Sequence, residues 1–142
     1  MANSVLPTVR LLFACDHAEY LADDEKWVLK HPWSVVALPE GAKFPFRVEE
    51  FWVYTQLAGG IGTFEVMVEM CQVKPDGTRR LCGRSSIHQV DFEDVHRLAG
   101  VDFAFQLKRV PFPSVGVYEF RLTCNEGVVP GVIFELRVLD RT

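Results

Sequence analysis

Apolar and polar residues alternate every two positions along most of the chain, which is the period of a β-strand with one buried face. The segment GTFEVMVEMCQV at 62–73 is the clearest example, and residues 115–124 and 132–140 repeat the pattern. The alternation predicts a core that includes Phe64, Val66, Val68, Met70, Tyr118, Phe120, Leu122, Leu136 and Val138. It predicts exposed side chains at Glu65, Glu69, Glu119, Arg121 and Arg137.

Turn residues separate these strands. In KPDGT, Pro75 fixes φ, Asp76 offers a local hydrogen bond and Gly77 accepts a positive φ, so we expect a hairpin of residues 62–74 and 79–87. Further strand candidates are 8–15, 26–30, 33–38, 49–57 and 101–110. With the two late segments, the chain has about eight or nine predicted strands.

One stretch, DFEDVHRLAG at 91–100, favours a short helix, with Asp91 as a possible N-cap and Gly100 as a stop. Many short strands with at most one short helix predict an all-β fold, an antiparallel β-sandwich that is immunoglobulin-like or jelly-roll-like. The length of 142 residues and the absence of a linker indicate a single domain, 1–142.

Charge and cysteine usage narrow the class of protein. Fifteen Lys and Arg against nineteen Asp and Glu give a formal charge of −4, with no basic run, so nucleic acid is not an expected partner. No apolar stretch reaches the roughly 18 residues that span a bilayer, so no membrane is expected. The four cysteines lack a CxxC pair and no signal peptide is evident, which favours the cytoplasm.

Cys15, Asp16 and His17 stand side by side and raise the question of nucleophilic chemistry. Neighbours on a strand point to opposite faces, so Asp16 is not placed to serve Cys15. We expect Cys15 to be the last inward residue of its strand, Asp16 to settle a turn, and His17 to be exposed where the chain leaves the sheet.

Other motifs are too weak to predict a catalytic or metal site. The cysteines and histidines lack zinc-site spacing, and the thiols of Cys71 and Cys82 are expected to be unlinked. The glycines of AGGIGTF precede a strand rather than a helix, which indicates a turn and not a phosphate loop. The paired acids 23–24 and 49–50 are neighbours and do not flank a sugar as glycosidase carboxylates must. We expect no metal and no cofactor.

Aromatic residues offer a candidate binding patch. In 49–57, Phe51, Val53 and Thr55 alternate with Trp52 and Tyr54. If the first set is in the core, Trp52 and Tyr54 point outward and, with Trp33, can stack on a sugar or contact a partner. The alternative is that a loop or a neighbouring strand covers them.

The order of several motifs resembles a bacterial family of small all-β proteins classed as a domain of unknown function. These motifs are LLFACDHAEYLADDEKWVLKHPWSVVALP, FPFRVEEFWVYTQL, a strand that ends in VKPDGT, and VPFPSVGVYEFRL before a closing strand. The segment SSIHQVDFEDVHRLAGVDF is longer than the family pattern. The resemblance implies a sandwich fold and no activity.

We therefore expect a protein that is not an enzyme: a binding or assembly module that presents a sheet face or edge to another protein or to itself. Outward apolar residues such as Met67 and Leu139 favour this reading. The alternative is a sandwich that binds a carbohydrate or small ligand through Trp52, Tyr54 or Trp33.

Overall fold

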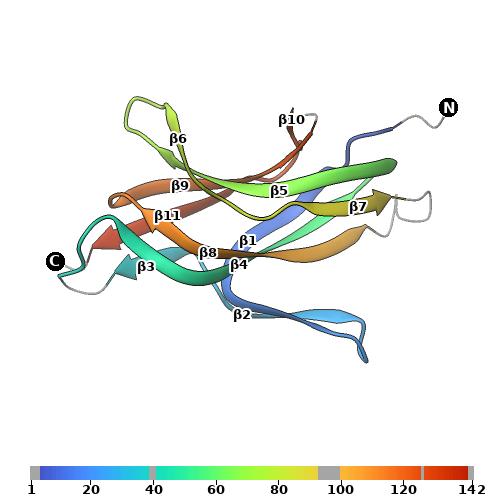
Figure 1. Cartoon of the computed structure of the whole chain (residues 1–142), viewed down its shortest axis with the longest axis horizontal. Coiled ribbons are helices and arrows are strands. Elements are labelled where there is room, and N and C mark those ends of the chain that lie inside the picture. Colours follow the sequence, from blue (N-terminus) through green and yellow to red (C-terminus); the bar gives the residue numbers. More distant parts are fainter. Residues whose placement is uncertain (1–3, 39–40, 93–99, 126, 141–142) are drawn as a thin grey trace.

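The computed structural model describes residues 4–38, 41–92, 100–125 and 127–140, which form two packed sheets (Figure 1). The first sheet has the order β2 (Lys26–Pro32), β1 (Thr8–Leu21), β4 (Phe46–Ala58) and β8 (Val101–Phe112). The second has the order β3 (Val35–Leu38), β11 (Phe134–Asp140), β9 (Gly116–Cys124), β5 (Gly62–Val73) and β6 (Arg79–Arg84). In addition, β7 (His88–Phe92) pairs with β5, and β10 (Gly127–Val128) pairs with β9.

These pairings confirm the predicted all-β, sandwich-like fold. Every strand pair is antiparallel except β3 with β11, which run parallel. All nine predicted strands are present, and β7 and β10 bring the number in the described residues to eleven.

The main core lies between the two sheets. All nine residues predicted to be inward on β5, β9 and β11 are buried. Phe51 of the first sheet meets Phe120 of the second edge to face, with ring centroids 5.9 Å apart. Each such large apolar side chain contributes about 1.5–3 kcal/mol when it is fully buried. The register predicted from the alternation is therefore confirmed.

The outer face of the second sheet departs from the prediction. Glu65 and Arg137 are exposed as expected, but Glu69, Glu119 and Arg121 are half-buried. Glu69 of β5 lies opposite Arg121 of the adjacent strand β9, and the two side chains are 3.9 Å apart; Glu119 is two residues before Arg121 on β9. The Arg79 guanidinium also bonds Glu119 at 2.8 Å, and this bond holds the pKa of the Glu119 carboxyl below its ordinary value. Neighbouring charged side chains shield each other on a central strand.

The β5–β6 hairpin forms as predicted. Thr78 accepts a hydrogen bond from the backbone N–H of Lys74, and Asp76 accepts one from the N–H of Thr78. Gly77 takes a φ of 87°, which suits glycine. β6 ends at Arg84, three residues before the predicted limit at residue 87.

The helix predicted for 91–100 is wrong at its start. Asp91 and Phe92 belong to β7, where Asp91 lies opposite Thr63 and accepts a hydrogen bond from its hydroxyl at 2.6 Å. Pairing with β5 therefore overrides the local signal for a helix N-cap. Residues 93–99 of the predicted helix lie outside the described residues. In the part of the chain that is described, no helix is long and apolar enough to cross a membrane.

The first strand is longer than predicted and bends. β1 continues to Leu21 and pairs with β2, and the resulting hairpin folds under the outer face of the first sheet (Figure 1). Its Trp27 reaches β8 and donates from Nε1 to the carbonyl of Asp102 at 3.4 Å. A second, small core fills the space beneath the hairpin and consists of Cys15, Ala18 and Ala104 with Trp27, Leu29 and Trp52.

Candidate functional site

The Cys15–His17 cluster does not assemble a nucleophile and a base. Cys15 is fully buried under the β1–β2 hairpin, on the outer face of its sheet and not in the main core as expected. Burial raises the pKa of its thiol to about 11, so the reactive thiolate does not form near neutral pH. Its packing role is confirmed, but its predicted face is wrong because the bent hairpin creates a second buried space.

Asp16 and His17 also differ from their predicted roles. Asp16 stabilises no turn, because β1 continues past it, and its Oδ1 accepts a hydrogen bond from Trp33 Nε1 at 2.7 Å. His17 is exposed as expected, yet it lies within a strand. Its ring packs edge to face with the Trp52 ring, with ring centroids 5.8 Å apart. The sequence pattern did not predict that residues 15–21 of β1 pair with β2.

The cysteine, histidine and acidic residues and the glycine-rich segment AGGIGTF form no metal or phosphate site in the described part of the chain. Among the described residues, no three His, Cys, Asp or Glu side chains come together as metal ligands would. Gly59 and Gly62 take positive φ and lead directly into β5, which confirms a turn between strands.

The proposed aromatic patch is wrong for Tyr54, which is 5% exposed. Trp52 and Tyr54 do lie on the outer face, but the β1–β2 hairpin covers them, and Trp27 packs edge to face on Tyr54 at 6.4 Å. Trp33 lies on the inner side against Phe51, with ring centroids 4.7 Å apart. Trp33 and Trp52 are both half-buried. The three residues therefore form no shared platform.

The start of β8 is the first candidate site, because its outer edge is an open sheet edge. Within the described residues β8 pairs only with β4. Its first half, Val101–Leu107, contains no proline and no basic residue. Its second half carries Lys108, then Arg109 at a φ of 53°, then Pro111. Lysine, proline and irregular backbone are the usual devices that keep a strand edge from pairing, so only the first half is unprotected.

The two halves of β8 also face different neighbours. Beside the second half, β6 packs so closely that a Cβ on Gly83 would lie 3.0 Å from Val110 Cγ1. Beside the first half, a hollow of about 320 Å³ separates β8 from β7 and is lined by His88, Gln89, Val90, Asp91, Val101, Asp102 and Phe103. The His88 ring stacks on Phe103 there, and burial lowers the pKa of His88.

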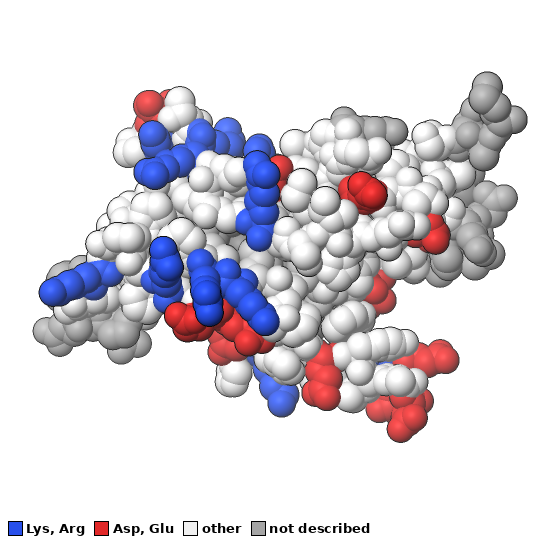
Figure 2. Space-filling view, in the orientation of Figure 1, with Lys and Arg blue, Asp and Glu red and all other residues white. Residues whose placement is uncertain are grey.

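Basic and acidic residues lie beside different halves of β8. Figure 2 shows most Lys and Arg over the half of the molecule that holds β6 and the second half of β8, with some Asp and Glu among them and others over the opposite half and the β1–β2 hairpin. The exposed basic residues of these two strands include Arg80, Arg84, Lys108 and Arg109. Asp91 and Asp102, which line the hollow beside the first half of β8, are exposed and acidic.

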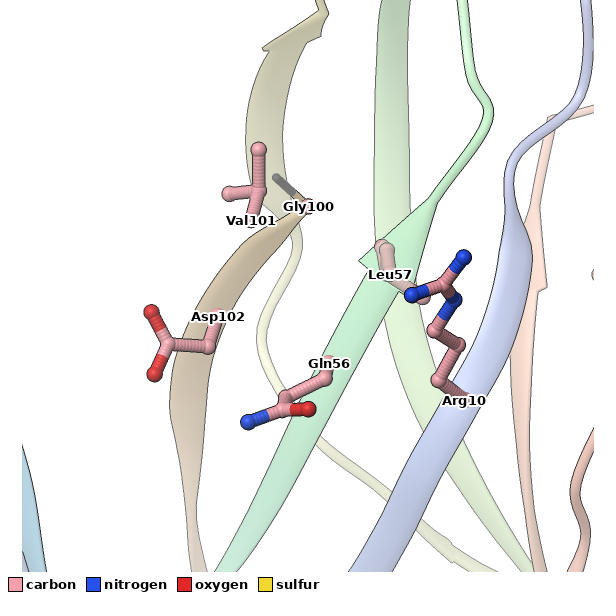
Figure 3. Close-up of a pocket in the computed structure, with 6 residues that line it drawn as sticks. All are labelled: Arg10, Gln56, Leu57, Gly100, Val101 and Asp102. Atoms are coloured by element: carbon pink, nitrogen blue, oxygen red, sulfur yellow. The ribbon is translucent and has the colours of Figure 1, made fainter. Parts of the chain in front are cut away.

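A second hollow, of about 190 Å³, lies at the end of the first sheet and is lined by Arg10, Gln56, Leu57, Gly100, Val101 and Asp102 (Figure 3). Arg10, Gln56 and Asp102 come from three adjacent strands. The pairing of β1 with β4 shifts between Val9 and Leu11, so Arg10 is the extra residue of a β-bulge. Bulges commonly redirect a side chain beside a binding site.

A chain of hydrogen bonds orients the polar groups of this hollow. Tyr54 donates its hydroxyl proton to Asp102 Oδ2 at 2.7 Å, and Gln56 Nε2 donates to the Tyr54 oxygen at 2.9 Å. Burial and the bond to Asp102 raise the pKa of Tyr54 to about 12, so the hydroxyl keeps its proton near neutral pH. The chain fixes the direction of the Gln56 amide.

The sequence signals for these two sites were weak. The adjacent residues Leu11 and Leu12 interrupt the alternation of the first strand, which is a sign of the bulge at Arg10. Nothing in the local pattern placed Gln56 and Asp102 together, because their contact depends on the pairing of β4 with β8.

Comparison with known proteins agrees with the resemblance seen in the sequence. Among curated proteins, no sequence matches this chain. Residues 10–137 match DUF6941, a family of unknown function, over most of the chain. The protein is thus a member of the DUF6941 family.

Proposed function

We propose that this domain is a non-enzymatic assembly module that pairs with a second copy of itself through the first half of β8. The observation that carries the proposal is the open edge of Val101–Leu107, which pairs with no described strand on one side and contains no lysine, arginine or proline. An exposed edge of this kind offers a row of backbone donors and acceptors to another strand.

The charges of β8 favour a second copy as the partner. Asp102 stands three residues before Phe105, and Lys108 stands three residues after it. In an antiparallel pair of two β8 strands centred on Phe105, Asp102 of each copy lies opposite Lys108 of the other. The two positions are six apart and so lie on the same face, which brings opposite charges together twice. Such a two-fold contact is closed and joins the first sheets of both copies into one.

The proposal also covers the cellular compartment of the protein and the classes of partner that it does not bind. We place the module in the reducing cytoplasm, with no nucleic acid or membrane as its partner. Cys15, Cys71 and Cys82 are thiols outside any disulfide, which supports this compartment. A disulfide at any of the three, found by mass spectrometry of protein isolated without reductant, would contradict it.

The proposal is tested by charge reversal and mixing. Asp102→Lys and Lys108→Glu each place like charges opposite each other twice, and each should weaken self-association by about tenfold in sedimentation equilibrium. An equimolar mixture of the two variants should restore it, because each copy then meets the opposite charge at both contacts. The double variant should also associate.

Two controls keep the result interpretable. Lys30→Glu makes the same charge change on exposed β2 and should leave association unchanged. Thermal melts of all variants report whether loss of the Tyr54–Asp102 bond disturbs the fold. A wild-type protein that stays monomeric at about 1 mM overturns the proposal, as does a mixture that associates no better than its components.

A further inference from the structure

The hollow around Arg10 brings together a basic donor and an oriented acceptor. Arg10 is exposed and forms no ion pair with the described part of the chain. In Figure 3 its side chain extends from β1 over Leu57, on the side of the hollow away from Asp102. Guanidinium groups bind carboxylates through two parallel hydrogen bonds, so Arg10 is suited to hold one.

The Gln56 amide presents its oxygen to the same space. Since Tyr54 gives its proton to Asp102, its oxygen accepts from Gln56, and the Gln56 nitrogen must face Tyr54. The amide oxygen is then directed the other way, and Figure 3 shows it on the side of Arg10, with the nitrogen on the side of Asp102. A ligand held by Arg10 therefore meets an acceptor that needs a donor.

The size and charge of the hollow narrow the ligand further. A volume of about 190 Å³ equals the space of about six water molecules. Asp102 adds a negative charge beyond Gln56, which favours a cationic donor over a neutral one.

We propose that this hollow binds a small α-amino acid, with its carboxylate on Arg10 and its ammonium group on the amide oxygen of Gln56. The two groups that hold the ligand, Arg10 and Gln56, lie on the inner strands β1 and β4, while Asp102 of β8 also takes part in the proposed pairing of two copies. Tyr54 and Asp102 act as positioning residues that fix the amide of Gln56.

Isothermal titration calorimetry with three matched probes tests the proposal on the full chain. Alanine should bind saturably, lactate should bind about tenfold more weakly because its hydroxyl is neutral, and propanoate should be weakest because it lacks a donor. Arg10→Gln should weaken alanine binding by about tenfold or more. Arg137→Gln, a change at an exposed arginine on β11, should leave it unchanged.

Tyr54→Phe tests the positioning role separately. This variant removes no group that touches the ligand, but it frees the Gln56 amide to rotate, so the preference for alanine over lactate should shrink. Sedimentation of each variant shows whether β8 pairing is affected. The proposal is overturned if alanine does not bind up to about 10 mM, if Arg10→Gln binds like the wild type, or if propanoate binds as tightly as alanine.

Discussion

The edges of β1 and β8 that face away from β4 differ in how much of the chain pairs with them. On the β1 flank, β2 pairs with residues 15–21, and Trp33 donates its backbone N–H to the Ala14 carbonyl. Further along, Val9 donates to Pro130 and accepts from Val132. On the β8 flank, no backbone hydrogen bond to another described strand closes the edge. The chain thus pairs the outer edge of β1 with its own segments, whereas the outer edge of β8 pairs with no described strand.

Only one part of the outer edge of β8 is suited to pair with another strand. A protein can protect an edge with basic residues, proline or irregular backbone, and the second half of β8 has all three at Lys108, Arg109 and Pro111. The unprotected edge is therefore Val101–Leu107, and Lys108 next to it supplies the charge that faces Asp102 of the other copy when the pair is centred on Phe105.

The largest effect is expected from breaking the seal on the β1 flank. Gly131 has a φ of 119°, and a Cβ there would lie 2.3 Å from the Val9 carbonyl oxygen. Gly131→Ala should therefore lower the free energy of unfolding by about 3 kcal/mol or more, through backbone strain and displacement of β1. Chemical denaturation measures the change.

Gly127→Ala is the matched control. Gly127 has a nearly identical φ of 118°, but nothing lies within 4 Å of its Cβ position. Strain alone should cost this variant about 1 kcal/mol. Equal losses in the two variants would mean that the contact of segment 129–132 with Val9 does not stabilise the β1 flank.

A smaller effect of pH is expected on the open flank. Burial keeps the pKa of His88 below its ordinary value of 6.5 in the folded protein. As pH falls below 6.5, the unfolded chain takes up a proton at this site before the folded chain does, so the free energy of unfolding decreases. The loss ends once pH falls below the folded pKa.

Denaturation curves of His88→Gln and wild type at about pH 7.5 and 5.5 measure this effect. His88→Gln should lose less stability on acidification than the wild type. His17→Gln, the same change at an exposed residue of β1, is the matched control variant. If His88→Gln keeps the wild-type pH dependence, His88 is not the group responsible.

The sequence pattern predicted the fold but not the two candidate sites, and the reasons are physical. Period-two alternation placed Phe64, Tyr118 and Leu136 inward, because burial between two sheets imposes that period directly. It could not reveal that β1 bends and covers Tyr54, since a covered outer face and an exposed one have the same alternation. The hollow at Arg10 depends on residues from three strands that only long-range pairing brings together.

Hydrogen exchange at two protein concentrations tests the central claim, the pairing of β8 with a second copy, most directly. Backbone amides that point outward from residues 101–107 should exchange rapidly in dilute protein and slow as concentration rises. Amides of residues 8–14 on the sealed flank should exchange slowly at both concentrations. If exchange at 101–107 does not change with concentration, β8 does not join two copies of this domain.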